Sequence, residues 1–332
     1  MLGKRYHNNG KSRLVLNDVQ IEQRNRILKH ITTGNYVFED ISCSICGKTN
    51  FHSLSEKDRY GIYLPIAICR HCGLVQATPR MLEESYNHFY NDGHRKLYVG
   101  REHPDEKYLQ GRYKAGKDTF EFLSNHLEIK GKRILEVGCG SGAILKYLHD
   151  HGASVKGIDL SREYLEYGKM KYQLDLEHIN LFDLPDDHKF DLIIYSDVLE
   201  HVLHPKTHLK KIKTLLKKGG ILYIKVPGVK HSQKAYQADF LKSLQNAHVY
   251  YFTATTLRNL LSCCGYSKIY SDETVRSLWK ISEDSNAPII NDYTNCMDYL
   301  EHLEKKYFLR NVYHIAALTL HWRSTMRNLK NH

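Results

Sequence analysis

A glycine-rich turn between two apolar segments is the part of this sequence best suited to binding a ligand. Residues 133–137 read Arg-Ile-Leu-Glu-Val, and Gly-Cys-Gly-Ser-Gly follows, with glycines at positions 138, 140 and 142. An apolar pattern at helical spacing comes next, so the stretch predicts a buried strand, a tight turn and a helix. Because glycine has no Cβ atom, a ligand could lie directly against the backbone N–H groups of this turn.

Two carboxylates near the turn indicate which ligand it could hold. A second predicted strand, residues 154–158, is followed by Asp159, and an acid at this separation suits hydrogen bonding to a ribose diol. The glycines follow the pattern G-x-G-x-G, whereas dinucleotide-binding turns follow G-x-G-x-x-G. Glu136 lies just before the turn. A carboxylate there would repel a pyrophosphate but would attract a cationic amino group.

These residues resemble the binding motifs of class I S-adenosylmethionine (SAM) methyltransferases. The matching segments are Glu136–Gly142, Gly157–Leu160 and Asp183, and the resemblance extends from residue 131 to about residue 281. It implies SAM as the cofactor, with the adenine amino group donating a hydrogen bond to Asp183. The cofactor-binding residues that the resemblance implies are Glu136, Gly138, Gly140, Gly142, Asp159, Leu160, Asp183, Leu184 and Ser196.

The order of the predicted elements fits the same family. Strands are expected over residues 133–137, 154–158, 177–180, 190–195, 221–226, 266–270 and 277–281, and helices over residues 116–127, 143–151, 161–171, 205–216 and 256–264. This alternation predicts an α/β fold, a doubly wound, Rossmann-like sheet of seven strands with helices on both faces. A ligand should lie over the carboxyl ends of the strands, where the chain order reverses.

Four cysteines form two C-x-x-C pairs ahead of the predicted sheet. Cys43 and Cys46 form the first pair and Cys69 and Cys72 the second, and a glycine follows each pair in position to take the left-handed conformation of a knuckle. Four thiolates in two knuckles suit a closed tetrahedral site for structural Zn²⁺. Free or redox-active thiols are the alternative. The nearby histidines, which we interpret as non-ligands because four thiolates complete the shell, are His52 and His71.

These motifs divide the chain into five segments. We expect an N-terminal extension (1–40), a zinc-ribbon-like four-cysteine module (41–78), an aromatic linker or cap (79–116), the SAM domain (117–283) and a C-terminal helical extension (284–332). The N-terminal extension is polar and basic, and we expect it to dock loosely, with a short helix over residues 18–29 capped by Asp18. The aromatic residues of the linker either pack on a neighbouring core or close over the cofactor.

Two histidines are candidate general bases. Methyl transfer from a sulfonium is an in-line displacement that depends on alignment, and a weakly acidic sugar hydroxyl also benefits from a positioned base. His201 follows the fourth predicted strand and His248 follows the fifth, so both should lie at the carboxyl edge of the sheet. The sequence favours His248 as the base, and a role in orienting a loop is the alternative for either histidine.

With its cysteine pairs, the chain also resembles methyltransferases of nucleotide-sugar and surface-glycan pathways. Sugar C-methyltransferases of that group carry Tyr-x-Glu before the histidine, whereas this chain carries Gln245, Asn246 and Ala247. The resemblance therefore implies O-methylation of a sugar hydroxyl. One alternative is an RNA base methyltransferase with a zinc module, although the fourth strand is not followed by the Pro-Pro-aromatic sequence that often grips a flipped base. Another is a non-catalytic zinc scaffold, although the binding motifs are intact.

Charge and the chain ends indicate the partners. Lys and Arg outnumber Asp and Glu by 48 to 37, for a net charge of +11, which favours anionic partners: nucleic acid, phosphorylated sugars or an anionic membrane face. The charge does not choose among them, and with the resemblance we expect an anionic small-molecule or glycan substrate, with nucleic acid as the less favoured partner. No signal peptide or membrane span is recognisable, so we expect a cytoplasmic protein, with contact at the inner membrane face as a further option. An apolar stripe at helical spacing from Phe308 to Leu329 indicates packing, homodimer formation or peripheral membrane contact.

Overall fold

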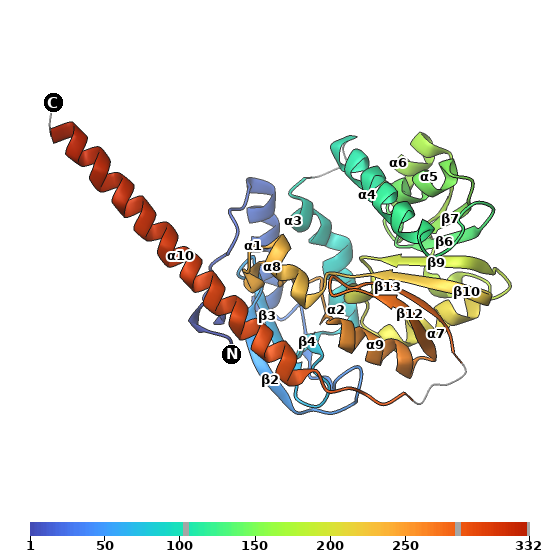
Figure 1. The fold of residues 1–332 in the computed structure, drawn as a ribbon, viewed down its shortest axis with the longest axis horizontal. Coiled ribbons are helices and arrows are strands. Elements are labelled where there is room, and N and C mark those ends of the chain that lie inside the picture. Colours follow the sequence, from blue (N-terminus) through green and yellow to red (C-terminus); the bar gives the residue numbers. More distant parts are fainter. Residues whose placement is uncertain (102–105, 283–286, 331–332) are drawn as a thin grey trace.

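The computed structural model describes residues 1–101, 106–282 and 287–330, excluding the side chains of residues 312–330. Its centre is a seven-stranded sheet in the order β12-β13-β10-β9-β6-β7-β8, with helices on both faces (Figure 1). From β8 to β10 the strands run parallel, and β13 and β12 complete the sheet antiparallel. The predicted doubly wound sheet of seven strands is therefore confirmed. The strands are β6 (Arg133–Val137), β7 (Ser154–Ile158), β8 (Asp175–Glu177), β9 (Phe190–Ser196), β10 (Leu216–Lys225), β12 (Tyr266–Ser271) and β13 (Arg276–Ile281).

Side chains that alternate along the strands divide the core between the two faces of this sheet. Ile134 and Leu192 belong to the cluster under α4, α5 and α6, whereas Leu135 and Ile193, one residue further along, belong to the cluster that includes α7 and α9. All four side chains are fully buried, as expected for parallel strands covered on both faces. The helices are α4 (Glu106–Ser124), α5 (Ala143–Asp150), α6 (Arg162–Tyr172), α7 (Pro205–Leu215) and α9 (Ala254–Cys263).

Several boundaries of the sheet domain differ from the prediction. Strand β10 begins at Leu216 instead of residue 221, and two further differences concern α4 and β8. Helix α4 begins at Glu106, ahead of the predicted start near residue 116, and it includes polar residues that the apolar pattern did not mark. Strand β8 pairs with β7 over Asp175–Glu177, so the third strand was predicted too late. Both errors arise where the apolar pattern is weak, because neighbouring elements decide those boundaries.

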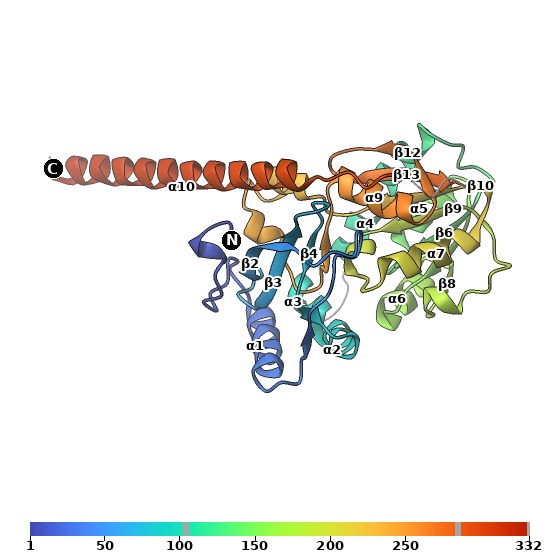
Figure 2. The same cartoon turned by 90° about the horizontal axis from the view of Figure 1, so that it is seen from below.

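The four-cysteine segment forms a second, smaller sheet that includes a strand from far along the chain. Its order is β11-β4-β3-β2, and Tyr250 of β11 pairs with Gln76 of β4. A single hydrophobic cluster contains both Ile66 of β3 and Leu135 of β6, so the two sheets share one core, and they lie next to each other in Figure 2. The strands are β2 (Phe51–Lys57), β3 (Tyr63–Cys69), β4 (Val75–Ala77) and β11 (Tyr250–Tyr251).

Short elements connect the two sheets along the chain. Strand β1 (Phe38–Glu39) pairs with β5 (Arg80–Met81), and α2 (Glu83–Phe89), a π-helical segment (Tyr90–His94) and α3 (Arg95–Val99) lead towards α4. Helix α8 (Ser232–Ala235) belongs to the segment between β10 and β11. Helix α1 contacts α3, so the N-terminal segment packs on this linker.

Helix α1 (Asp18–Thr32) shows how tertiary contacts fix the N-terminal segment. Its N-cap is Asn17, whose side chain accepts a hydrogen bond from the backbone N–H of Gln20 at 3.0 Å, so the predicted Asp18 cap is wrong. The Asn17 amide also donates to the backbone oxygen of Gly100 at 3.0 Å. This long-range contact favours Asn17 as the cap, and no local pattern reveals it.

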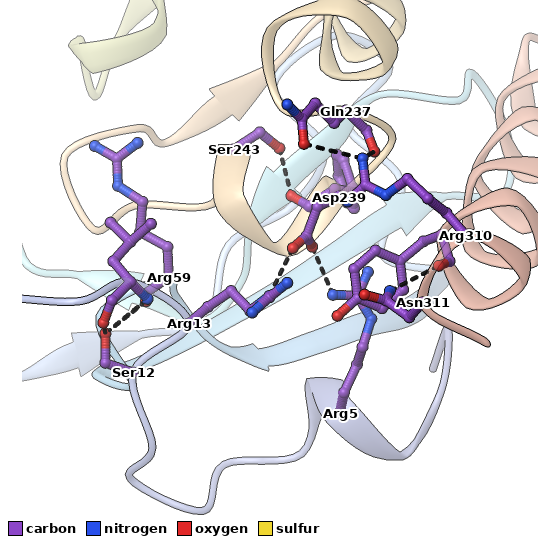
Figure 3. A network of polar contacts seen from close by, with 12 residues as sticks. Arg5, Ser12, Arg13, Arg59, Gln237, Asp239, Ser243, Arg310 and Asn311 are labelled. Carbon is purple, nitrogen blue, oxygen red and sulfur yellow. Dashed lines mark hydrogen bonds and ion pairs between the residues drawn. The ribbon is translucent and has the colours of Figure 1, made fainter. Parts of the chain in front are cut away.

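Ion pairs attach the N-terminal segment to the region between β10 and β11. Arg5 and Arg13 donate to the carboxylate of Asp239 at 2.5 Å and 2.6 Å, and Asp239 is fully buried (Figure 3). In the same region, Arg310 donates to the backbone oxygen of Gln237 at 2.7 Å. The N-terminal segment is therefore packed on the body of the protein and is not loosely docked as expected.

Helix α10 (Tyr293–Lys330) packs through its first turns and then extends away from both sheets (Figures 1 and 2). The buried residues of those turns are Cys296, Met297, Leu300 and Leu303. Most of the predicted apolar stripe lies beyond residue 311, outside the described side chains. Among the described residues, none of the helices has both the length and the apolar character that crossing a bilayer requires.

Candidate active site

The glycine-rich turn joins the carboxyl end of β6 to α5, as the sequence predicts. Gly138, Gly140 and Gly142 have φ angles of 73°, 56° and 70°, which residues other than glycine rarely adopt. A Cβ atom on Gly138 would also lie 2.5 Å from a methyl carbon of Val198. The turn therefore requires glycine for its backbone conformation, independently of any ligand.

Glu136 is buried beside this turn without a partner. The residue is 1% exposed, and neither carboxylate oxygen has a hydrogen-bond partner among the described residues. Burial raises the pKa of Glu136 to about 8; Arg112 opposes this rise, whereas Asp159 and Asp197 add to it. Burying a polar group without a partner is costly, and a ligand that brings a donor or a positive charge would remove that cost. The position therefore fits a cationic amino group.

Asp159 follows β7 and connects two loops at the carboxyl edge of the sheet. Its Oδ2 accepts a hydrogen bond from the backbone N–H of Gly140, and its Oδ1 accepts one from Ser161, both at 2.7 Å. Ser161 is the N-cap residue of α6, but its hydroxyl makes no capping hydrogen bond. Each carboxylate oxygen can accept a second hydrogen bond, so Asp159 keeps acceptor capacity for ribose hydroxyls. The next residue, Leu160, is 57% exposed.

The remaining predicted cofactor residues follow β8 and end β9. Asp183 closes a 3₁₀ turn, and its Oδ2 accepts a hydrogen bond from the backbone N–H of Asn180 at 3.2 Å. Asp183 is exposed, whereas Leu184 is buried. Ser196, the last residue of β9, is 4% exposed. The structure therefore places the predicted cofactor residues after the carboxyl ends of four neighbouring strands, β8, β7, β6 and β9.

Sequence reasoning missed an ion pair at this edge. Nη1 of Arg112, on α4, lies 3.6 Å from Oδ2 of Asp197, the residue directly after β9. Asp197 has a φ of 57°, a left-handed conformation that non-glycine residues adopt rarely and often at functional sites. The hydroxyl of Tyr108, also on α4, lies 3.5 Å from the position of a Cβ atom on Gly140. The first turns of α4 thus reach the glycine turn. Had α4 been predicted to begin at Glu106, the sequence would have indicated that Tyr108 and Arg112 lie near this turn.

The two candidate bases lie next to each other. The ring centroids of His201 and His248 are 4.7 Å apart, with one ring edge-on to the other. Nδ1 of His201 lies 2.8 Å from the backbone oxygen of Ala247, so Nδ1 carries the proton and Nε2 carries the lone pair. The hydroxyl of Tyr86 lies 2.7 Å from the backbone oxygens of both His201 and Ala247. This tyrosine of α2 therefore holds the two histidine loops together.

The lone pair of His248 is already engaged. The side-chain amide nitrogen of Gln245 contacts Nε2 of His248, and Nη2 of Arg59 donates to the amide oxygen of Gln245 at 2.8 Å. Because the arginine fixes the amide orientation, the Gln245 NH₂ group donates and His248 Nε2 accepts. Nε2 of His201 lies 3.7 Å from Oε1 of Glu200, beyond hydrogen-bond distance.

Burial keeps both imidazoles neutral. It lowers the pKa of His201 to about 4 and lowers that of His248 well below its ordinary value. Glu200, which lies near both rings, is 1% exposed; neither of its oxygens has a partner among the described residues, and burial raises its pKa. A neutral imidazole has a lone pair that can accept a proton. Both histidines are thus more enclosed than their predicted loop positions suggested.

Aromatic rings of the linker cover these histidines. The ring of His94 stacks on Tyr90, with centroids 4.9 Å apart, and on Tyr98, at 6.0 Å. His94 and Tyr90 lie 5.9 Å and 5.8 Å from the ring of His201. The segment is kinked at Gly93, whose backbone is not helical. Tyr98 is 55% exposed and forms the outer side of this aromatic layer.

The four predicted metal ligands converge in the smaller sheet. The Sγ atoms of Cys43 and Cys72 lie 3.4 Å apart, those of Cys46 and Cys69 lie 3.5 Å apart, and all four lie within 4.8 Å of one another. A disulfide would need about 2.05 Å, whereas sulfurs around a tetrahedral Zn²⁺ lie about 3.8 Å apart. The donor set therefore fits a closed Zn²⁺ site, and neither nearby histidine belongs to the cluster. The glycines after the two pairs have the predicted left-handed φ of 71° and 79° in Gly47 and Gly73.

Comparisons with known proteins concern the larger sheet. A family model described as "Methyltransferase domain" matches residues 106–271, from the start of α4 to the end of β12. The ubiquinone biosynthesis O-methyltransferase of Coxiella burnetii is 31% identical over 122 residues, which is 35% of this chain and 51% of that protein. The protein of the same name from Nitrosococcus oceani is 33% identical over 138 residues, 38% of this chain and 58% of that protein. The chain thus spans about half the length of these curated relatives.

Solved structures with a similar fold are more distant. The PH0226 protein of Pyrococcus horikoshii has a TM-score of 0.43 at 16% identity, covering 54% of this chain and 93% of that chain. Magnesium protoporphyrin IX methyltransferase of Synechocystis, solved with bound SAM, has a TM-score of 0.42 at 17% identity, covering 58% of this chain and 92% of that chain.

Proposed function

Because this chain belongs to the family of methyltransferase domains, we propose that it transfers the methyl group of SAM to a hydroxyl group of its acceptor. The observation that carries this proposal is the buried carboxylate of Glu136, which has no hydrogen-bond partner among the described residues and lies beside the glycine turn. The amino group of SAM would supply the missing positive charge. Asp159, at the end of the next strand, would accept hydrogen bonds from the ribose hydroxyls.

SAM supplies an electrophilic methyl group on its sulfonium, so the chain itself must align the acceptor and remove its proton. A hydroxyl that is only weakly acidic needs a base for this step. We assign the proton-accepting atom to Nε2 of His201, because the amide of Gln245 already occupies Nε2 of His248. In this arrangement His248 positions the His201 loop, which reverses the order of preference that the sequence suggested.

Two kinds of hydroxyl are candidates for the acceptor. The sequence resemblance implies a sugar hydroxyl of a nucleotide sugar or surface glycan. A phenolic hydroxyl is the second candidate, because the curated relatives are named ubiquinone biosynthesis O-methyltransferases. Carbon methylation is disfavoured, since Gln245 and Ala247 stand where the C-methyltransferases of the glycan group carry Tyr and Glu.

The four-cysteine site completes the proposal. Cys43, Cys46, Cys69 and Cys72 would hold one structural Zn²⁺ and leave no coordination position for substrate or water. The ion would stabilise the smaller sheet and take no part in methyl transfer.

Calorimetry with S-adenosylhomocysteine (SAH) tests the donor site, and methyl transfer from labelled SAM tests the acceptor. The full chain should bind SAH. Asp159→Ala should abolish binding while circular dichroism stays native, and its Tm should fall because Gly140 and Ser161 lose their acceptor. Nucleotide sugars, a catechol and RNA, offered in parallel, separate the three classes of acceptor. A chain that binds neither SAM nor SAH would be a scaffold, and methyl transfer to RNA alone would refute the hydroxyl acceptor.

A further inference from the structure

Arg59 lies in the tight turn between β2 and β3, within the four-cysteine module. Asp58, its neighbour, is fully buried and accepts hydrogen bonds at Oδ1 from the backbone N–H groups of Tyr60 and Ile62, at 2.8 Å and 2.9 Å. The other oxygen of Asp58 accepts from the Asn246 amide at 3.0 Å. The acid next to Arg59 is thus engaged with other donors, and it does not form an ion pair with the arginine.

The guanidinium of Arg59 is buried among neutral groups. The residue is 5% exposed; Nη1 donates to the backbone oxygen of Lys242 at 3.2 Å, and Nη2 donates to the amide oxygen of Gln245 at 2.8 Å and to the hydroxyl of Tyr60 at 3.0 Å. Its Nε has no hydrogen-bond partner in the part of the chain that the structure describes. The guanidinium carbon also lies 5.4 Å from the ring centroid of Tyr98. No carboxylate of the described residues lies within ion-pair distance of it.

Another buried arginine, just after the module in the chain, shows what is missing. Arg80 is 8% exposed, and its Nε lies 3.0 Å from a carboxylate oxygen of Glu39. Arg59 has no such acid, and its guanidinium points away from the Asp239 cluster in Figure 3. A buried charge without a counter-ion is strongly unfavourable. An anion that binds at Arg59 would remove this cost.

The position of Arg59 indicates which ligand would bring that anion. Its Gln245 partner contacts His248, and the His248 ring lies 4.7 Å from the His201 ring, so two side chains connect the charge to the proposed base. Tyr98, which packs on the guanidinium, also stacks on His94 in the aromatic layer over His201. Arg59 therefore belongs to the acceptor end of the site, whereas Glu136 marks the donor end.

We propose that Arg59 binds an anionic group of the methyl acceptor, a phosphate or a carboxylate, and that the four-cysteine module thereby selects the substrate of the methyltransferase domain. This inference rests on the proposed function. Arginine suits the task because its guanidinium stays charged when it is buried, and its Nε–H can donate a charge-assisted hydrogen bond to either anion. Arg59 would be a specificity residue, since it holds a remote group of the acceptor while His201 takes the proton.

Anion binding to the SAH-saturated full chain tests the proposal without an identified acceptor. Inorganic phosphate and acetate serve as separate probes, and the readout is the shift in Tm with probe concentration. At least one probe should raise the Tm of the native chain, and the preferred probe identifies the anion class. Arg59→Met should abolish the shift, and Arg59→Lys should retain part of it. Arg70→Met, which removes an exposed arginine of the same module, should shift as the native chain does.

The outcomes separate this inference from the proposed function. Arg59→Met should bind SAH with the affinity of the native chain. If the native chain itself does not bind SAH, the proposed donor site is refuted instead. If neither probe raises the Tm of the native chain, the inference is overturned. It is also overturned if a probe raises the Tm of Arg59→Met and of the native chain equally. Once an acceptor is known, its KM should rise about 10- to 100-fold in Arg59→Met, with a smaller change for a matched neutral analogue. Equal rises for both would assign Arg59 a purely structural role.

Discussion

The pH dependence of SAM binding is the most direct test of the role assigned to Glu136. Its carboxyl group has a pKa of about 8 because it is buried without partners. The amino group of SAM pairs with the ionised form, so binding at lower pH must release the proton of Glu136. Roughly 1% of this carboxyl group is ionised at pH 6 and roughly 9% at pH 7. A free α-amino group, with a pKa of about 8, stays mostly protonated over this range.

The affinity for SAM should therefore rise about ninefold between pH 6 and pH 7, with release of close to one proton. Calorimetry in buffers of different ionisation enthalpy measures both quantities. Glu136→Gln should bind SAM more weakly and lose most of this pH dependence. Glu200→Gln is a matched control, because Glu200 is also buried without partners but lies at the histidines. A native chain without the slope, or a Glu136→Gln chain that keeps it, would refute the reasoning.

The same carboxyl group should affect the stability of the unliganded chain. Its pKa rises on folding from an ordinary value of 4.5 to about 8, so the folded state holds the proton more tightly than the unfolded state. The associated stability is fully present below pH 4.5 and is lost as the pH rises to about 8. At pH 7 the loss is on the order of 3 kcal/mol. Urea unfolding at several pH values should show this trend in the native chain and a flatter one in Glu136→Gln.

Three further predictions concern the other parts of the chain. Asp159→Asn should weaken SAH binding about 10- to 100-fold in calorimetry with a native circular dichroism spectrum, and native affinity would remove its ribose role. His201→Asn should leave SAH binding intact but slow methyl transfer about 10²- to 10⁴-fold, whereas His248→Asn should slow it less; the reverse order would make His248 the base. Cys46→Ser should lower the Tm and also the zinc content, which is measured by mass spectrometry. A native chain that contains no zinc would refute the metal site.

The sequence by itself determined the larger sheet and the glycine turn. Residues 133–137 and 154–158 were predicted as strands with the bounds that β6 and β7 have, because their apolar runs end at turn residues and acids. The spacing of the cysteine pairs likewise predicted the convergence of their sulfur atoms, since each knuckle is a local structure. Such features are readable because their determinants lie within a few residues of one another.

Only the tertiary structure decided which side chains surround the proposed acceptor site. In the folded chain β11 joins the four-cysteine sheet, and Arg59 donates a hydrogen bond to Gln245. The Gln245 amide in turn contacts Nε2 of His248, whereas no described donor contacts Nε2 of His201. Burial and hydrogen-bond partners depend on segments far apart in the chain, and a residue's type and local spacing carry no information about them. For the same reason the sequence offers both histidines as candidate bases without the contacts that distinguish them, and no local pattern marks Arg59.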